Sequence, residues 1–163
     1  MTCDSHCHFF SSQFFVTLAQ QRGRGDTVAT LCNELQWEDP AEPEALADRW
    51  VKELDERAVA RAALIASVPG DEGSVASAVA RHPGRFVGFF MIDPSAGDAP
   101  DRVRHAVTIL GLRAVCLFPA MHHVALTDAR IERIVDVAAS LPGTAIFVHC
   151  GVLSVGVRKR LGL

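Results

Sequence analysis

The sequence predicts an α/β protein that is built on a parallel sheet. Five short apolar runs, rich in β-branched and aromatic residues, alternate with stretches whose apolar residues recur at helical spacing. The runs are almost continuously apolar, as in strands whose faces are both buried. A repeated strand–helix order of this kind is typical of parallel sheets. The predicted strands are residues 2–8, 61–67, 86–92, 112–118 and 144–148.

The first predicted helix lies between the first and second strands. Residues 9–40 are expected to be irregular, because glycine and proline interrupt them. From residue 43 to about residue 57, apolar residues recur at three- and four-residue spacing, which predicts an amphipathic helix. These residues are Leu46, Trp50, Val51 and Leu54.

Three further helices are predicted between the later strands. The first of them, residues 71–81, ends at the helix-breaking residues 82–84. The next, from about residue 100 to residue 110, ends at Gly111, a residue type that often follows the last helical turn. The last begins at Thr127 or Asp128, either of which can cap a helix. Its apolar face consists of Ile131, Ile134, Val135 and Ala138.

Length and composition predict one folded domain over residues 1–163, with neither nucleic acid nor membrane as a partner. Of the 163 residues, 49% are hydrophobic and 21% are charged, which is the profile of a folded chain. The net charge of −3 provides no basic stripe, and the basic cluster Arg158-Lys159-Arg160 is expected to be a solvated helix face. No apolar run approaches the roughly 20 residues that a membrane span needs.

The cysteines and the N-terminus predict a cytoplasmic protein. The five cysteines are an odd number at irregular spacing, which favours reduced thiols. The first residues show neither the charged leader nor the apolar segment of a secretory signal. Reduced thiols are the normal state in the cytoplasm.

Two architectures fit this order of elements. A doubly wound sheet of five strands would be complete at this length. A (β/α)₈ barrel needs about 250 residues and would be unfinished. The pattern alone slightly favours the complete sheet.

The strongest local signal is the segment Asp4-Ser5-His6-Cys7-His8 in the first strand. Side chains at i and i+2 of a strand project to the same side, so Asp4, His6 and His8 are expected to share a face. Two imidazoles on one face can bind one metal ion. Asp4 could orient one of these imidazoles without binding the ion itself. Alone, such a pair is more often exposed or hydrogen-bonded. Its place at the end of an apolar strand, where parallel α/β folds carry function, favours a metal site.

His149 ends the fifth strand, directly after an apolar run. Burial of a histidine without a partner costs free energy, so His149 is either bonded to a core carbonyl or a ligand. Because His6 and His8 are expected at the same edge of the sheet, a three-histidine metal site is the favoured interpretation. Three neutral ligands would leave the charge of the ion available to polarise a water molecule or a substrate oxygen.

Three motifs, in this order, resemble the amidohydrolase-related superfamily and most of all its branch of aminocarboxymuconate-semialdehyde decarboxylase-like enzymes. They are Asp-x-His-x-His in the first strand, Gly-Leu-Arg-Ala-Val-x-Leu-x-Pro at residues 111–119 and Val-His-x-Gly at residues 148–151. The resemblance implies a partial (β/α)₈ TIM barrel with parallel strands, consisting of the first five βα units and truncated after the fifth strand. It therefore overrides the doubly wound alternative.

The same resemblance implies a site and a chemistry. His6, His8 and His149 match metal ligands of the superfamily, whose members use zinc or another divalent ion for hydrolysis or non-oxidative decarboxylation. A further histidine and an acid–base aspartate, which normally complete such a site, would lie beyond residue 163, so the catalytic residues stay unassigned.

The fourth strand departs from the pattern of many relatives, which carry lysine and histidine where this chain has Cys116 and Phe118. A bridging carbamylated lysine is therefore not available, which argues for one metal ion rather than two. Cys7, Cys116 and Cys150 are expected to be inert, buried thiols.

Weaker candidates surround the expected site. His122 and His123 follow the fourth strand and could contact an anionic substrate, although surface histidines without such a role are commoner. Asp93 is expected to be a turn residue. The phenylalanines after the first strand are expected to cover the barrel mouth, namely Phe9, Phe10, Phe14 and Phe15.

Three functions stay open at this point. The favoured one is an enzyme that acts on a small, carboxylate-bearing substrate, with the 163-residue segment alone inactive or nearly so. The second is a non-catalytic metal-binding or interaction protein that kept the three histidines. The third, a structural zinc site of Cys3, Cys7, His6 and His8, is disfavoured because cysteines and histidines face opposite sides of a strand. Exposed edges of the first and fifth strands are expected to promote homo-oligomers.

Overall fold

The computed structural model describes residues 1–150 as five parallel strands and seven helices. The strands are β1 (Thr2–Phe9), β2 (Val59–Ala66), β3 (Phe86–Met91), β4 (Ala114–Leu117) and β5 (Ala145–Val148). The helices are α1 (Ser12–Arg22), α2 (Val28–Leu35), α3 (Pro43–Glu56), α4 (Glu72–Arg81), α5 (Ala99–Thr108), α6 (Pro119–His122) and α7 (Ala129–Ala139).

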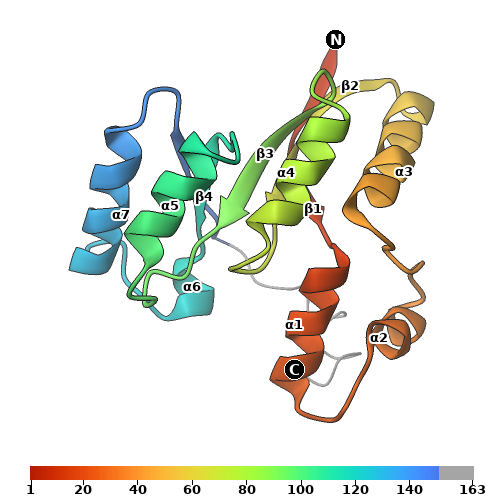
Figure 1. The fold of residues 1–163 in the computed structure, drawn as a ribbon, viewed down its shortest axis with the longest axis horizontal. Helices are drawn as coiled ribbons and strands as arrows, with labels where there is room; N and C mark the ends of the chain where they lie inside the picture. The colour runs from red at the N-terminus through yellow and green to blue at the C-terminus, as the bar shows by residue number, and fades with distance from the viewer. Residues whose placement is uncertain (151–163) are drawn as a thin grey trace.

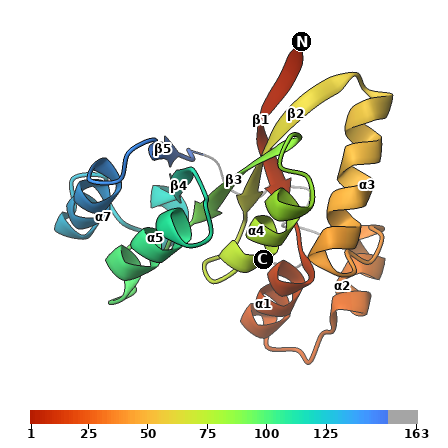
Figure 2. The same ribbon diagram turned by 45° about the horizontal axis from the view of Figure 1, so that its top comes forward.

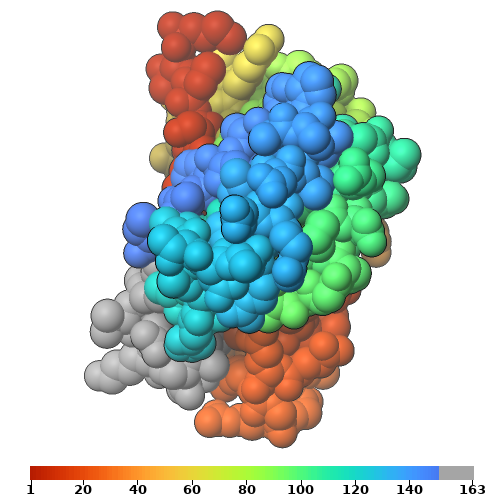
Figure 3. Space-filling model, turned by 90° about the vertical axis from the view of Figure 1, so that its left-hand side faces the viewer, coloured from red at the N-terminus to blue at the C-terminus, as the bar shows by residue number. Residues whose placement is uncertain are grey.

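The strands pair in chain order, β1-β2-β3-β4-β5, and every pairing is parallel. Helices α3, α4, α5 and α7 lie along one side of the curled sheet (Figures 1 and 2). Helices α5 and α7 pack against each other and cover one flank of the molecule (Figure 3). The predicted helices and strands that build this core are therefore confirmed.

The two faces of the sheet bury different partners. Leu64 of β2 belongs to the main core, which it shares with helix residues such as Val103 and Ile134. Its neighbour Ile65 points to the other face and packs in a small cluster of strand residues and Phe118, without a helix. Helices on one face only, together with sequential strand order, make this a partial (β/α)₈ barrel. The doubly wound alternative, which needs helices on both faces and a switch in strand order, is wrong.

Gly88 in β3 lets helix α4 and the segment between α5 and β4 approach the sheet closely. A Cβ atom at this position would lie 2.9 Å from Cγ1 of Val75 and would collide with Cδ2 of Leu112. Both neighbours are fully buried, so neither has free space to move into. The absence of a side chain at residue 88 therefore sets the distance between sheet and helix layer.

The expectation that residues 9–40 are irregular is wrong, because helices α1 and α2 form there. Helix α1 begins after Ser11, whose hydroxyl accepts from the Phe14 N–H, and ends at Gly23 in the left-handed region. Helix α2 begins at a capping box between Thr27 and Thr30. Both helices lie beyond the carboxyl end of β1 (Figure 1). Their buried residues form a separate small core, comprising Phe14, Phe15, Leu18, Leu31, Cys32, Leu35 and Val68.

A second segment that was expected to be a loop also forms a helix. The segment after the fourth strand, expected as a loop, contains the short helix α6. None of the helices in residues 1–150 combines the length and apolar character needed to cross a membrane. The basic cluster Arg158-Lys159-Arg160 and the glycine of the Val-His-x-Gly motif lie outside the described residues.

The sheet has two free edges within the described residues. β1 pairs only with β2, and residues 2–6 of β1 are all exposed. β5 pairs only with β4, and its Ile146 and Val148 are 37% and 38% exposed. These edges leave backbone groups and apolar side chains available for further pairing.

Candidate metal centre

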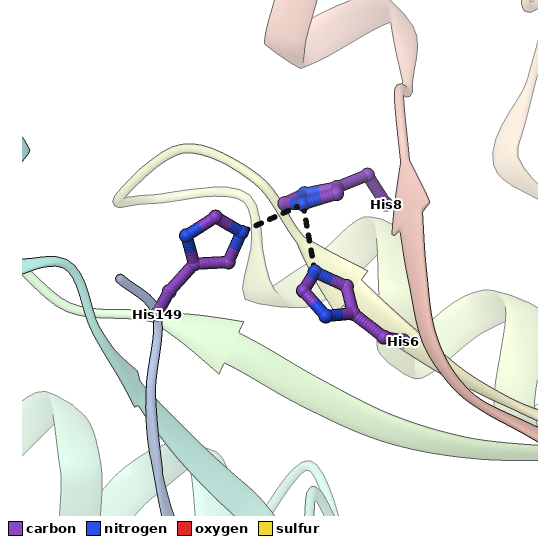
Figure 4. Close-up of side chains that lie close together, drawn as sticks. All are labelled: His6, His8 and His149. Atoms are coloured by element: carbon purple, nitrogen blue, oxygen red, sulfur yellow. Dashed lines mark hydrogen bonds between the residues drawn. The ribbon is translucent and has the colours of Figure 1, made fainter. Parts of the chain in front are cut away.

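Three histidines from the two edge strands converge at the carboxyl ends of the strands. Nε2 of His8 lies 3.1 Å from Nε2 of His6 and 3.2 Å from Nε2 of His149 (Figure 4). The ligand atoms of the three side chains all lie within 4.8 Å of one another. His149 follows β5 directly, so the curl of the sheet brings the carboxyl ends of its two edge strands together. The structure thus assembles the three residues that the sequence analysis selected.

The spacing of the three nitrogens suits a single divalent ion. Two imidazole nitrogens at about 2.0–2.1 Å from one tetrahedral zinc ion lie about 3.3 Å apart, close to the 3.1 and 3.2 Å found here. Histidine nitrogens are also ligands that zinc prefers. The residues present therefore fit a zinc ion, and His6, His8 and His149 would hold it.

The ring of His8 is oriented by Ser67, which follows β2. Nδ1 of His8 lies 2.9 Å from the Ser67 hydroxyl, which itself donates to the carbonyl of Ile65 at 3.0 Å. Because the hydroxyl has one hydrogen, it accepts from Nδ1–H of His8. Nε2 of His8 is then the unprotonated nitrogen, and its lone pair points between the other two rings.

The environment keeps His8 neutral. Burial, together with the smaller effects of the nearby rings of His6 and His149, lowers the pKa of His8 to about 4. A neutral imidazole is the form that binds a metal ion. At neutral pH, His8 is thus in the protonation state that a ligand requires.

An aromatic side chain packs against each of the three histidines. Phe118 stacks on His149, with ring centroids 4.3 Å apart and an angle of 18° between the planes. Phe10 stacks on His8 at 5.6 Å, and Phe147 meets His6 edge-on at 5.2 Å. Phe10 was expected near the barrel mouth from its place after the first strand, whereas the contacts of Phe118 and Phe147 were not expected. Phe10 and Phe118 therefore each cover one face of a histidine ring, whereas His6 stays exposed.

Asp4 does not occupy the position expected for it. Asp4 pairs with Ala62 and Cys7 with Leu64, so β1 contains one extra residue between these pairs. This β-bulge reverses the alternation, so Asp4 lies on the side of Cys7, and the expectation that it shares a face with both histidines is wrong. Its carboxylate accepts from the backbone N–H of His6 at 2.9 Å. That contact, followed by the one with the Cys7 thiol, lowers the pKa of Asp4.

The cysteines take no part in the histidine cluster. Cys7 is buried in the main core on the helix side of the sheet, where burial and the Asp4 carboxylate raise the pKa of its thiol to about 12. Burial also raises the pKa of Cys116 to about 12, so neither thiol is reactive at neutral pH. Cys150 is exposed, contrary to the expected burial. Within residues 1–150, the group of side chains that could hold an ion contains histidines alone, which argues against the structural zinc site.

The weaker candidates lie on the same rim of the sheet. His122, in α6, is half-buried, and its Nδ1 atom is buried without a hydrogen-bond partner among the described residues. Burial lowers its pKa, whereas Asp93 acts in the opposite direction. Asp93 accepts from the N–H of Ser95 at 2.8 Å, as a turn residue does. His123 is exposed.

A cavity of about 610 Å³ lies between β1 and helix α3. It is lined by His8, Phe10 and Trp37 and by residues of α3 such as Leu46 and Trp50. Trp37 stacks on Phe10 at 5.3 Å. The cavity therefore reaches the histidine cluster from the free edge of β1.

Comparisons with known proteins identify solved structures with a similar fold. No protein-family model and no curated protein matches the chain. Among solved structures, it is similar to 5-carboxyvanillate decarboxylase from Sphingomonas paucimobilis (TM-score 0.70, 16% identity, 97% of this chain and 54% of that chain). It is also similar to a protein described as amidohydrolase II (TM-score 0.63, 16% identity, covering 99% of this chain and 55% of that chain). A third similar structure is that of a probable 2-pyrone-4,6-dicarboxylic acid hydrolase from Acinetobacter baumannii (TM-score 0.58, 14% identity, covering 91% of this chain and 49% of that chain).

These likenesses concern the fold. The chain spans about half the length of the solved structures that it matches. Over that half, its curled sheet and alternating helices have the same fold as these structures, a partial (β/α)₈ barrel, as the sequence resemblance implied.

Proposed function

We propose that this chain is the N-terminal part of a metal-dependent hydrolase or non-oxidative decarboxylase of the amidohydrolase-related superfamily. It would bind one divalent ion, most favourably zinc, through His6, His8 and His149, and act on a small organic substrate that carries a carboxylate. The observation that carries the proposal is the convergence of three Nε2 atoms from strands at opposite edges of the sheet.

The position of the cluster supports catalysis rather than a purely structural role. His8 and His149 lie at the carboxyl ends of parallel strands, which is where barrel enzymes carry their active sites. When bound, the ion would supply the positive charge that polarises a substrate oxygen. His8 contributes a fixed, neutral nitrogen, and Phe10 and Phe118 stack on the rings of His8 and His149.

The names of the neighbours support the choice of substrate class and reaction. One is a decarboxylase of 5-carboxyvanillate and another a probable hydrolase of a pyrone dicarboxylic acid, so both names contain a carboxylate-bearing substrate. The proposal therefore includes both decarboxylation and hydrolysis.

An acid–base group is a further requirement of both reactions. The cluster contains no carboxylate within the described residues. In the superfamily that this chain resembles, an aspartate beyond the matched half supplies this group. We therefore expect the 163-residue chain by itself to show little or no turnover.

The second candidate is a non-catalytic metal-binding or interaction protein. The absence of a carboxylate from the ligand group in residues 1–150 is the observation that favours it.

For either candidate function, the free sheet edges support homo-oligomer formation. The free thiol state of all five cysteines supports a reducing compartment such as the cytoplasm.

Equilibrium dialysis against zinc tests the proposed site. We expect close to one zinc ion per chain in the wild type and in His105→Ala, whose exposed histidine lies on α5, and little in His8→Ala. Equal zinc content in His8→Ala and the wild type would refute the site. Where the coding region continues past Leu163, CO₂ release or hydrolysis by the longer protein, lost in His8→Ala, would separate the enzyme from the non-catalytic alternative.

A further inference from the structure

Ser67 contacts the ring nitrogen of His8 that faces away from the other two histidines. His8 of β1 is in register with Ile65 of β2, and Ser67 follows Ile65 by two residues. Because alternate residues share a face, the register aims Ser67 at the same side of the sheet as His8. Ser67 is only 5% exposed, and its hydroxyl lies 2.9 Å from Nδ1 of His8.

The direction of this hydrogen bond decides the tautomer of His8. The one hydrogen of the Ser67 hydroxyl is donated to the carbonyl of Ile65, 3.0 Å away. The hydroxyl can then only accept from His8, which must carry its proton on Nδ1. A histidine with this tautomer presents the lone pair of Nε2, the atom that faces His6 and His149.

We infer that Ser67 is a positioning residue that fixes the ring and the tautomer of His8 for metal binding. The inference rests on the proposed function, in that the ligand is a divalent ion at the three histidines. A hydrogen bond from the far nitrogen of a ligand histidine holds the ring in place and raises the basicity of the ligating nitrogen. Ser67 thus fills the supporting role that the sequence analysis assigned to Asp4.

A second contact fixes the loop that carries Ser67. The hydroxyl of Ser11, which follows β1, donates to Oδ2 of Asp71 at 2.6 Å, and both side chains are at most 2% exposed. This bond ties the loop after β2 to the loop after β1 independently of Ser67. Removal of the Ser67 hydroxyl alone should therefore leave the loop in place and affect the ring of His8.

The test compares Ser67→Ala, which removes the hydroxyl, with Ser67→Thr, which keeps it. Ser140→Ala is the matched control, because it removes an exposed serine hydroxyl that donates to the carbonyl of Val137 in α7. Circular dichroism and thermal melting establish that each variant is folded. Two quantities are then measured: the ¹⁵N shifts of the His8 ring in the zinc-free protein, assigned with His8→Gln, and the zinc affinity by chelator competition.

We expect the wild type, Ser67→Thr and Ser140→Ala to carry the His8 proton on Nδ1 and to bind zinc with similar affinity. In Ser67→Ala, the proton should distribute over both ring nitrogens, and zinc affinity should fall roughly 10- to 100-fold. An unchanged tautomer in Ser67→Ala would overturn the inference, as would an unchanged zinc affinity. Failure of the wild type to bind zinc would refute the proposed function instead, whereas the ring shifts of the zinc-free protein would still test the hydrogen bond.

Discussion

The Nε2 atoms of His8 and His149 lie 3.2 Å apart, although 141 positions in the sequence separate the two residues. His8 belongs to β1 and His149 follows β5, so their contact spans the opening of the curled sheet. Any ligand that binds both side chains should therefore connect the two edge strands and stabilise the sheet as a whole.

Zinc should raise the thermal stability of the protein. At a free zinc concentration about 100 times the Kd, binding to the native state adds about 2.7 kcal/mol. For a chain of this size, that corresponds to an increase in Tm of roughly 5–10 °C. Differential scanning fluorimetry with and without zinc measures the shift. His149→Ala should lose most of it, and His105→Ala should keep it. A full shift in His149→Ala would show that zinc binds elsewhere.

Acid should destabilise the metal-free protein through His8. Its pKa is about 4 in the folded protein against 6.5 for an ordinary histidine, so below pH 6.5 the unfolded chain binds a proton that the native state excludes. The contribution is present above about pH 6.5 and is lost as pH falls towards about 4. Its size is at most about 3 kcal/mol and about 1–2 kcal/mol once the partial exposure of the ring is allowed for.

Urea unfolding at pH 7 and pH 4.5, in the presence of a chelator, measures this contribution. His8→Gln, which cannot titrate, should lose less stability between the two pH values than the wild type does. Equal losses in both proteins would contradict the assigned protonation state of His8.

Gly88→Ala should destabilise the fold, because the new methyl group would press on Val75 and Leu112. Overpacking of this kind costs about 1–3 kcal/mol of unfolding free energy. Gly73→Ala is the control, since Gly73 lies in helix α4 with open space around it and should be neutral or stabilise the protein by up to about 1 kcal/mol. Urea unfolding of both variants gives the comparison. If the two variants were equally stable, close packing at Gly88 would not be required.

The free edges of the sheet should cause self-association. Ile146 on β5 is 37% exposed at one of these edges. A charge there opposes strand pairing, so Ile146→Lys should shift the protein towards the monomer in size-exclusion chromatography with light scattering. Ile109→Lys, at a position 71% exposed after helix α5, should leave the association unchanged. A wild type that is monomeric at all concentrations would refute the expectation.

The sequence predicted the elements whose pattern is dictated by burial. The second strand was expected at residues 61–67 and is observed at Val59–Ala66, because a strand covered by helices is apolar at every position. Helices α1 and α2 were missed because glycine and proline suggested loops. Their caps at Ser11 and Thr27 are local signals that could have revealed them.

The site was predictable only in part. His6, His8 and His149 could be selected because each lies at or near a strand end, and the sheet then brings them together. The displacement of Asp4 depends on a bulge in the pairing of β1 with β2, which leaves no mark in the residue pattern. The contact of Ser67 with His8 likewise depends on the register between two strands, and register is a property of the folded sheet.

X-ray absorption at the zinc edge, on protein loaded with one equivalent of zinc, counts the imidazoles bound to the ion. We expect three imidazole nitrogens at about 2.0–2.1 Å in the wild type, and one fewer in His149→Ala. A sulfur ligand at about 2.3 Å, or an unchanged number of imidazoles in His149→Ala, would contradict the three-histidine site.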